Sequence, residues 1–411
     1  MDGHIIVVGL GFGDEGKGAV VDALCHDGPV TSVIRFNGGA QAAHNVVVDD
    51  RHHTFSQFGS GTLAGVPTHL SRHVLVEPIA LARESRELET LGVADPLRLV
   101  SIDADALLTT PIHVSANRAR EDARGHGRHG SCGKGIGETA WYALLAGRNA
   151  LPGDTVENQR VLGVPGDAPT VGDCARPTVL RAKLDALARF YEPLIGDGTS
   201  VDDLVSLYRD FADAVHVTTG DEVGRLAERG RLVFEGAQGV LLDQRHGFHP
   251  HTTWSTVTPD NARTLLGHRH ATVIGVTRTY QTRHGAGPLP TEDHAVLARF
   301  PERHNGTGHY QGAWRAGHLD AVLLRYAVAA CDGVDALAVT HLDAHDLKVA
   351  TTYDAPLPTT NLTEFLNHRT PVLTDLPDPI AWLEDQLGVP VLVTGAGPDR
   401  ADYAVRTPVH P

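Results

Sequence analysis

The sequence has little cysteine, and what it has is scattered. Its 411 residues include four cysteines, with no CxxC pair among them. Paired cysteines are the usual mark of structural zinc sites and disulfide frameworks, so the chain is expected to have neither. The pattern is typical of a reducing compartment, and we expect a cytoplasmic protein. The four residues are Cys25, Cys132, Cys174 and Cys331.

Long apolar runs and an excess of positive charge are also missing. The longest apolar candidate, 321–339, is interrupted by Arg325, Asp332 and Asp335, which excludes a membrane helix there. The N-terminus enters a predicted strand at once, so no signal peptide is expected. Lys and Arg total 35 against 50 Asp and Glu, giving a formal charge of −15 and no basic stripe. Neither a membrane nor a nucleic acid is an expected partner.

The chain contains no internal repeat, low-complexity tract or long Pro/Ser linker. Strand-like and helix-like segments alternate, which predicts an α/β fold: a large, mostly parallel central sheet with helices on both faces. We expect a single domain over 1–411, with 147–177, rich in Gly, Pro and Asp, as a surface insertion. Strands are predicted at 32–36, 231–234, 271–276, 336–340 and 389–394, and helices at 78–91, 178–195, 201–214 and 318–331.

The most informative segment is 5–24, IIVVGLGFGDEGKGAVVDAL. A run of β-formers leads into five glycines and then into a helix-forming stretch. Such a loop presents backbone N–H groups to an anion, and the helix N-terminus favours negative charge, so phosphate is the expected ligand. Lys17 adds a mobile positive charge. Asp14 and Glu15 are acidic residues beside a bound phosphate, which suggests Mg²⁺ ligation, base chemistry or both.

Three interpretations compete for this P-loop-like phosphate loop. The letters at 11–16 fit a dinucleotide fingerprint, but the next strand ends in RFN (35–37) and not in the required acidic residue. The spacing up to Lys17 also fits a P-loop, although Gly18 replaces the Ser or Thr that would hold Mg²⁺. In the third interpretation Asp14 itself is the metal ligand, and this is the interpretation we favour.

GFGDEGKG, followed by RFNGGAQAAHNVVV at 35–48, resembles the adenylosuccinate synthetase family. Further matches come in the same order: FEGAQGVLLD (234–243), TRTYQTRHGAGPLPTE (277–292), THLD (340–343) and GPDR (397–400). Because these motifs span nearly the whole chain, it is identified as a divergent member. The resemblance implies a homodimeric, Mg²⁺-dependent ligase. GTP would phosphorylate the 6-oxygen of IMP, and the amine of aspartate would then displace the phosphate to give adenylosuccinate.

The resemblance also assigns roles to individual residues. Asp14 is the base and a Mg²⁺ ligand, and Lys17 offsets charge on the moving phosphoryl group. His44 matches the family's catalytic histidine, and the carbonyl of Ala43 its second Mg²⁺ ligand. Gln238 holds the 6-oxo side of the purine. The rest of the implied nucleotide site is Gly13, Glu15, Gly16, Gly18, Asn45, Arg315, His341, Asp343, Gly395, Ala396 and Gly397, with Asp343 reading guanine.

Several substrate contacts depart from the family pattern. His341 stands where lysine is usual, which leaves ATP open as an alternative to GTP. At the 5′-phosphate end of IMP, near Thr253, the family's Thr-Thr-Gly-Arg becomes SCGK, so that Ser131 and Cys132 replace two threonines. Gln41 stands where asparagine is usual. Arg148 is the nearest candidate for the arginine that the family lends across its dimer interface.

The largest departure is in the aspartate loop, where the family has Thr-Thr-Gly-Arg followed by more arginines. This chain has HYQGAWR at 309–315, from His309 to Arg315, and only that last arginine survives. Gly312 and Ala313 cannot replace the bidentate contacts of two arginines with a carboxylate. Either Arg303, His304 or His309 fills the gap, or the nucleophile is another amine.

Three hypotheses follow. The chain is a divergent adenylosuccinate synthetase acting on IMP and aspartate. Alternatively, it is a paralogue that applies the same chemistry to a modified purine nucleotide, or with a different amine, in specialised metabolism. The third hypothesis is a catalytically silent nucleotide-binding subunit, which the presence of Asp14, Lys17 and His44 disfavours.

Overall fold

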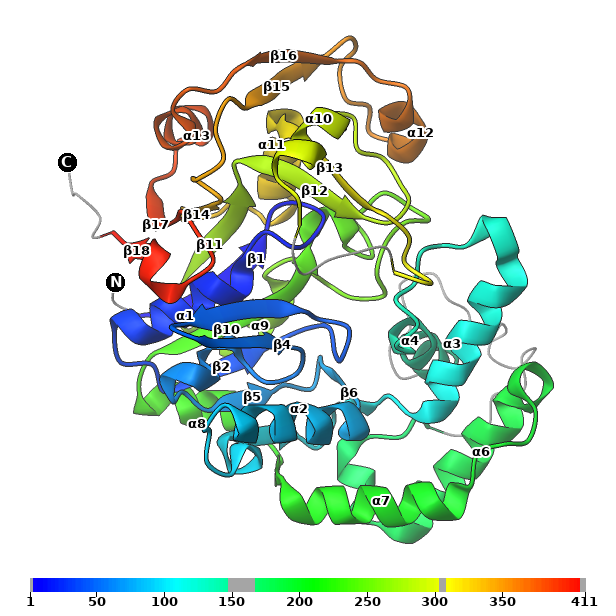
Figure 1. The fold of residues 1–411 in the computed structure, drawn as a ribbon. Helices are drawn as coiled ribbons and strands as arrows, with labels where there is room; N and C mark the ends of the chain where they lie inside the picture. Colours follow the sequence, from blue (N-terminus) through cyan, green and yellow to red (C-terminus); the bar gives the residue numbers. More distant parts are fainter. Residues whose placement is uncertain (1–2, 147–166, 303–307, 407–411) are drawn as a thin grey trace.

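A ten-stranded sheet forms the centre of the molecule (Figure 1). The computed structural model describes residues 3–146, 167–302 and 308–406. Within the sheet only β18 runs antiparallel to its neighbour, so the predicted mostly parallel sheet is confirmed. In spatial order its strands are β18 (Tyr403–Val405), β17 (Val391–Gly395), β14 (Ala336–Thr340), β11 (Ala271–Arg278), β1 (His4–Gly9), β10 (Leu232–Gly239), β2 (Ser32–Arg35), β5 (Thr68–Leu70), β7 (Val100–Asp103) and β9 (His216–Thr218).

Helices cover both faces of this sheet, as predicted. In the central strand β1, Ile5 and Val7 pack in one core cluster with α1, while Ile6 and Val8 pack in another on the opposite face. A strand buried on both faces needs apolar residues at every position, which explains the unbroken run at the start of the chain. The helices involved are α1 (Lys17–Asp27) on one face and α8 (Glu222–Arg229), α9 (Asp260–Leu266), α11 (Ala321–Ala330) and α13 (Pro379–Leu387) on the other.

A second helical layer packs at the β5–β7 end of the sheet (Figure 1). The described end of the expected surface insertion, 167–177, belongs to this layer: Val171 and Cys174 are fully buried. The expectation of a surface loop is therefore wrong for that end, because these apolar side chains complete a core. Arg148 lies outside the described residues. The helices are α2 (Pro78–Thr90), α3 (Pro111–Arg124), α4 (Ile136–Leu145), α6 (Pro177–Ile195) and α7 (Val201–Ala214).

Smaller elements surround the sheet. A four-stranded sheet has the order β12-β13-β15-β16, and β3 and β4 form a hairpin. Their bounds are β12 (Tyr280–His284), β13 (Trp314–Asp320), β15 (Lys348–Tyr353), β16 (Pro371–Asp375), β3 (His44–Val48), β4 (Arg51–Phe55), β6 (Leu75–Val76), β8 (Leu107–Leu108), α10 (His294–Arg299) and α12 (Leu362–Asn367). Short 3₁₀ turns are η1 (Ser60–Ala64), η2 (Pro96–Leu99), η3 (Gly125–Gly127), η4 (Val171–Asp173), η5 (Val240–Leu242) and η6 (Arg400–Asp402).

The predicted element bounds hold to within a few residues. The strand predicted at 336–340 and the helix predicted at 201–214 match β14 and α7. The helix predicted from residue 318 begins only at Ala321, because His318 to Asp320 complete β13. The Asp320 carboxylate then caps the helix, accepting from the backbone N–H groups of Val322 and Leu323, both at 3.1 Å. Among the described residues, no helix is both long and apolar enough to span a membrane.

Candidate active site

A cavity of about 1070 Å³ opens among the loops that follow β1, β10, β11 and β14. The carboxyl ends of neighbouring parallel strands meet at one edge of a sheet, where α/β proteins bind ligands. Sixteen of the predicted site residues line this one cavity. They are Gly13, Asp14, Gly16, Lys17, Gly18, Gln41, Ala43, His44, Asn45, Ser131, Cys132, Gln238, Thr253, His341, Asp343 and Gly397.

The phosphate loop runs from the end of β1 to the start of α1 and is organised by its own carboxylate. Glu15 accepts from the backbone N–H groups of Gly11 (3.0 Å) and Gly13 (2.8 Å) and from Lys17 Nζ (2.6 Å). A Cβ at Gly9 would lie 2.2 Å from a Glu15 oxygen, so a side chain there would displace this carboxylate from its place in the loop. Glu15 does not line the cavity, and the expectation of a mobile Lys17 is wrong, because the side chain is buried against Glu15.

Asp14 occupies the tip of this loop in a left-handed backbone conformation (φ 61°). The Nε–H group of Arg278 donates to its backbone carbonyl at 2.6 Å. Among the described residues, no hydrogen bond engages the Asp14 carboxylate itself. Burial raises the pKa of Asp14 and the charge of Arg278 opposes that shift. A carboxylate with raised proton affinity on a cavity wall is suited to removing a proton from a bound substrate.

The cavity also offers a place for a divalent cation. The described residues contain no group of three or more His, Cys, Asp or Glu side chains that could hold a metal. Asp14 and Ala43 both line the cavity, so one carboxylate and one backbone carbonyl are available there. A sparse oxygen donor set, completed by phosphate oxygens and water, is the environment that Mg²⁺ takes in nucleotide sites. The residues present therefore fit Mg²⁺.

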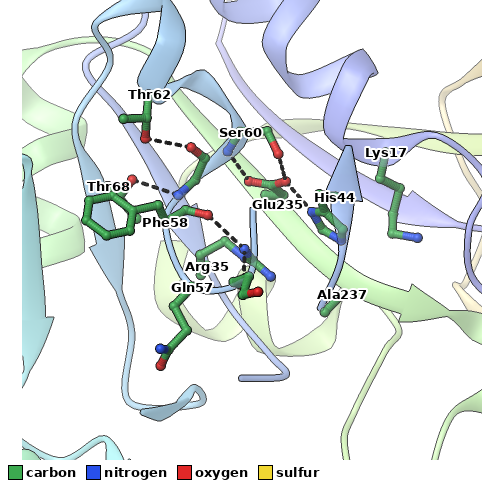
Figure 2. Close-up of polar contacts among 12 residues, drawn as sticks. Lys17, Arg35, His44, Gln57, Phe58, Ser60, Thr62, Thr68, Glu235 and Ala237 are labelled. Atoms are coloured by element: carbon green, nitrogen blue, oxygen red, sulfur yellow. Dashed lines mark hydrogen bonds and ion pairs between the residues drawn. The ribbon is translucent and has the colours of Figure 1, made fainter. Parts of the chain in front are cut away.

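His44 begins β3 and is held from behind by Glu235 of β10 (Figure 2). Its Nδ1 lies 2.5 Å from Glu235 Oε1, and both side chains are buried. Burial lowers the pKa of His44, opposed by the charge of Glu235. Burial would raise the pKa of Glu235, but Arg35 and His44 outweigh it and lower that pKa to about 2. The carboxylate is thus ionised and accepts a hydrogen bond from the Nδ1–H group.

Unpartnered amide atoms mark the side of the cavity predicted for the purine. Gln238 Nε2 donates to Thr253 Oγ1 at 3.0 Å, while its Oε1 is buried and has no hydrogen-bond partner among the described residues. The amide nitrogen and oxygen of Gln41 are likewise buried without a hydrogen-bond partner among the described residues. Ser131 donates instead to Asn117 Oδ1 at 2.9 Å. Buried polar atoms without partners are rare, so these atoms indicate a polar ligand.

The region predicted for the nucleotide base lies beyond β14. His341 stands edge-on to Tyr280, with ring centroids 5.6 Å apart, and burial keeps its pKa well below the usual value. His341 therefore presents a neutral ring to the cavity, whereas the lysine that the family usually has at this position would present a positive charge. Asp343 and Gly397 also line the cavity, whereas Gly395 and Ala396 do not.

His309 and Ala313, predicted to bind substrate, line a second cavity of about 550 Å³ together with Arg315, which was predicted to bind the nucleotide. It shares Gly130, Ala286 and Gln311 with the larger cavity. The guanidinium of Arg315 donates to both oxygens of Glu292, at 3.0 and 2.5 Å, and to the Gly287 carbonyl at 2.7 Å. Arg315 is thus committed within the protein and does not line the cavity predicted for the nucleotide. Arg303 and His304 lie outside the described residues.

Comparison with known proteins agrees with this geometry. The model of the adenylosuccinate synthetase family matches residues 6–375. The chain belongs to this family. It is 31% identical to the adenylosuccinate synthetase of Marinomonas sp. (strain MWYL1) and 33% identical to that of Chromohalobacter salexigens, with 98% of each chain covered. Like the rest of the adenylosuccinate synthetase family, it is a GTP-dependent ligase that forms a carbon–nitrogen bond.

Two solved structures share the fold of this adenylosuccinate synthetase family member. One is the fully ligated adenylosuccinate synthetase of Plasmodium falciparum, with a TM-score of 0.81 and 20% identity, covering 98% of this chain and all of that one. The other is the succinoaminodeoxyadenylate synthetase of cyanophage S-2L, bound to dGMP and to dATP as an energy donor. Its TM-score is 0.63 at 17% identity, with 98% and 95% of the chains covered.

Sequence reasoning missed two charged residues at this site. Glu235 supports His44, and Arg278 contacts Asp14. Each is the single charged residue of its strand, as in VFEG and GVTR. A charged residue in an otherwise uncharged, buried strand could have indicated both residues, because a buried charge is stable only when it has a partner.

Proposed function

We propose that this protein phosphorylates the 6-oxygen of IMP with GTP and then joins the activated purine to the amine of aspartate, giving adenylosuccinate. The observation that carries the proposal is the meeting of Asp14, Lys17 and His44 on the wall of one cavity that also holds Gln238 and Thr253. The names of the relatives at 31–33% identity support the same activity.

The residues divide the chemistry as follows. Asp14 removes the purine N1 proton, so that electron density moves to the 6-oxygen, which attacks the γ-phosphorus while the bond to GDP breaks. Lys17 offsets negative charge on the transferred group, and His44 donates a hydrogen bond to that group from Nε2 when this nitrogen carries a proton. The amine then attacks C6 and phosphate leaves, a far better leaving group than an amide-like oxygen. Mg²⁺, held by Asp14 and the Ala43 carbonyl, would neutralise charge on the nucleotide phosphates.

A second candidate function keeps the activation step and changes the amine. It is favoured by the loop at 308–315, where Gly312 and Ala313 carry no charge and Arg315 is bound to Glu292. The fold accommodates other nucleotides: the cyanophage protein binds dGMP and dATP. In this case the chain would be a paralogue acting with another amine, or on a modified purine nucleotide.

We also propose that the chain works as a single domain over 1–411, in the cytoplasm and as a homodimer. Four free cysteines support residence in a reducing compartment. The resemblance to the family supports the dimer, because family members complete their site with an arginine from the partner subunit.

The test is phosphate release by the purified protein with Mg²⁺, GTP or ATP, and IMP, with and without aspartate, reading product masses. Aspartate-dependent adenylosuccinate is the expected product. GDP and a phosphorylated intermediate without adenylosuccinate would select the second candidate. No turnover with IMP would contradict the proposed acceptor.

A further inference from the structure

Glu235 is a carboxylate fully buried in the central sheet. On the adjacent parallel strand its Cα partner is Arg35, which is also fully buried. An ionised carboxylate in such a place is costly unless charges and hydrogen bonds compensate for it. Here Ser60 donates its backbone N–H to Oε2 at 2.9 Å and its hydroxyl to Oε1 at 2.5 Å, and His44 occupies the remaining side (Figure 2).

Arg35 is held in turn by the backbone. Its Nη1 donates to the carbonyls of Ser56 (3.0 Å) and Phe58 (3.1 Å), as Figure 2 shows for Phe58. The N–H groups of these same residues donate to the buried carboxylate of Glu84, at 2.8 and 3.2 Å. The arginine opposite Glu235 is therefore held by two backbone carbonyls, and its charge favours the ionised form of Glu235.

This arrangement determines which nitrogen of His44 carries a proton. An ionised carboxylate only accepts hydrogen bonds, so the nitrogen that faces it must be the donor. At 2.5 Å from Glu235, that nitrogen is Nδ1. His44 also lines the large cavity, which leaves Nε2 as the ring nitrogen that can face a bound phosphoryl group. Nε2 donates to a phosphoryl oxygen once it has taken up a proton, while Nδ1–H stays bonded to Glu235.

We propose that Glu235 is the positioning residue for His44: it fixes the ring orientation and the Nδ1–H tautomer, so that Nε2 meets the phosphoryl group during activation. Ser60 holds the carboxylate in place by two hydrogen bonds, and the charge of Arg35 on the adjacent strand favours its ionised form. This inference rests on the proposed phosphorylation step, which supplies the group that His44 meets. The tautomer itself is a property of the resting protein and can be measured without turnover.

The first measurement is ¹⁵N NMR of histidine-labelled protein at neutral pH, with the His44 signals identified by their loss in His44→Gln. The Nδ1–H tautomer is expected in the wild type. In Glu235→Gln, whose amide can also donate, that tautomer should no longer dominate. A wild-type signal that does not report Nδ1–H, or one unchanged in Glu235→Gln, overturns the proposal whatever the protein's substrate.

The second measurement is the kinetics of GDP formation. Glu235→Gln should lower kcat about 10- to 100-fold, the usual cost of losing a partner that orients a functional histidine, with KM for GTP changed less than about threefold. Glu235→Asp retains the charge opposite Arg35 and should fold, yet its shorter side chain withdraws from Nδ1, so kcat should fall about tenfold or more. Wild-type kcat in Glu235→Asp overturns the proposal.

A matched control separates positioning from simple burial. Asp173 is a fully buried carboxylate bound to Arg176 and Lys183 within the helical layer, and it does not line the cavity. Asp173→Asn should lower the unfolding temperature and leave kcat, KM and the His44 tautomer unchanged. If Asp173→Asn lowered kcat as much as Glu235→Gln does, the loss would reflect stability alone and the proposal would fail.

Discussion

The phosphate loop with His44 and the amine loop at 308–315 are built in opposite ways. In the first, charged pairs are buried: Lys17 with Glu15 at 2% and 4% side-chain exposure, and His44 with Glu235 at 8% and 0%. In the second, Arg315 and Glu292 are 22% and 31% exposed. Buried pairs fix a geometry, whereas pairs that are partly open to solvent are screened and contribute less to stability. Under the proposed function, the activation step is thus the more rigidly fixed of the two, and the amine is selected at a partly exposed loop.

The sharpest way to break this contrast is to remove the base. Asp14→Asn should lower the rate of GDP formation by about 10²- to 10⁴-fold, the usual contribution of a general base, while nucleotide still binds. Stopped-flow GDP formation and nucleotide titration measure the two effects. Asp49→Asn, at an exposed turn with the same left-handed backbone, is the control and should be neutral. Near-normal turnover in Asp14→Asn would rule out its role as the base.

A substitution at Asp343, the residue predicted to bind guanine, tests whether the choice of nucleotide is fixed as firmly as the activation step. Asp343→Asn replaces a charged acceptor with a neutral amide, so kcat/KM for GTP should fall about 10- to 100-fold, with less change for ATP. Competition between the two nucleotides measures the ratio. Asp332→Asn, at an exposed turn, should leave it unchanged. If the GTP/ATP ratio stayed constant in Asp343→Asn, guanine would be read elsewhere.

A positive charge added to the amine loop tests whether that loop selects the amine. Ala313→Arg adds a donor to the second cavity and should lower KM for aspartate about tenfold, with GDP formation in the absence of amine unchanged. Ala313→Gln adds similar length without charge and serves as the matched control. An arginine no better than glutamine would mean that the cavity does not bind the amine's carboxylates.

The smallest effect is expected where the amine loop meets α3. Arg128 donates to the His309 carbonyl at 2.8 Å and to Asp122 at 3.0 Å, both at the surface. Arg128→Ala should raise KM for the amine only about two- to fivefold, because exposed pairs contribute little. Arg98→Ala, which removes an exposed pair with Asp95, is the control. A comparable fall in the phosphorylation rate would show that the two regions are not independent.

Much of the fold could be predicted because its cues are local. The apolar run into glycines at the start of the chain predicted β1, the phosphate loop and α1, which the structure confirms. Apolar periodicity predicted α7 at its observed bounds. The start of α11 was missed, because β13 runs without a break into the residue that caps the helix. Pairing with a distant strand, and not local propensity, decided that boundary.

The sequence by itself determined the family, the phosphate loop and sixteen of the residues that line its cavity, because each depends on short motifs whose chemistry is local. Only the tertiary structure joined Glu235 to His44, 191 residues away, and Arg400 to Asp22, 378 residues away. It also directed Glu15 into the phosphate loop, where it does not line the cavity. Motifs along the chain show which side chains a loop can offer. The partner of a buried charge, by contrast, depends on which strands become neighbours in the sheet.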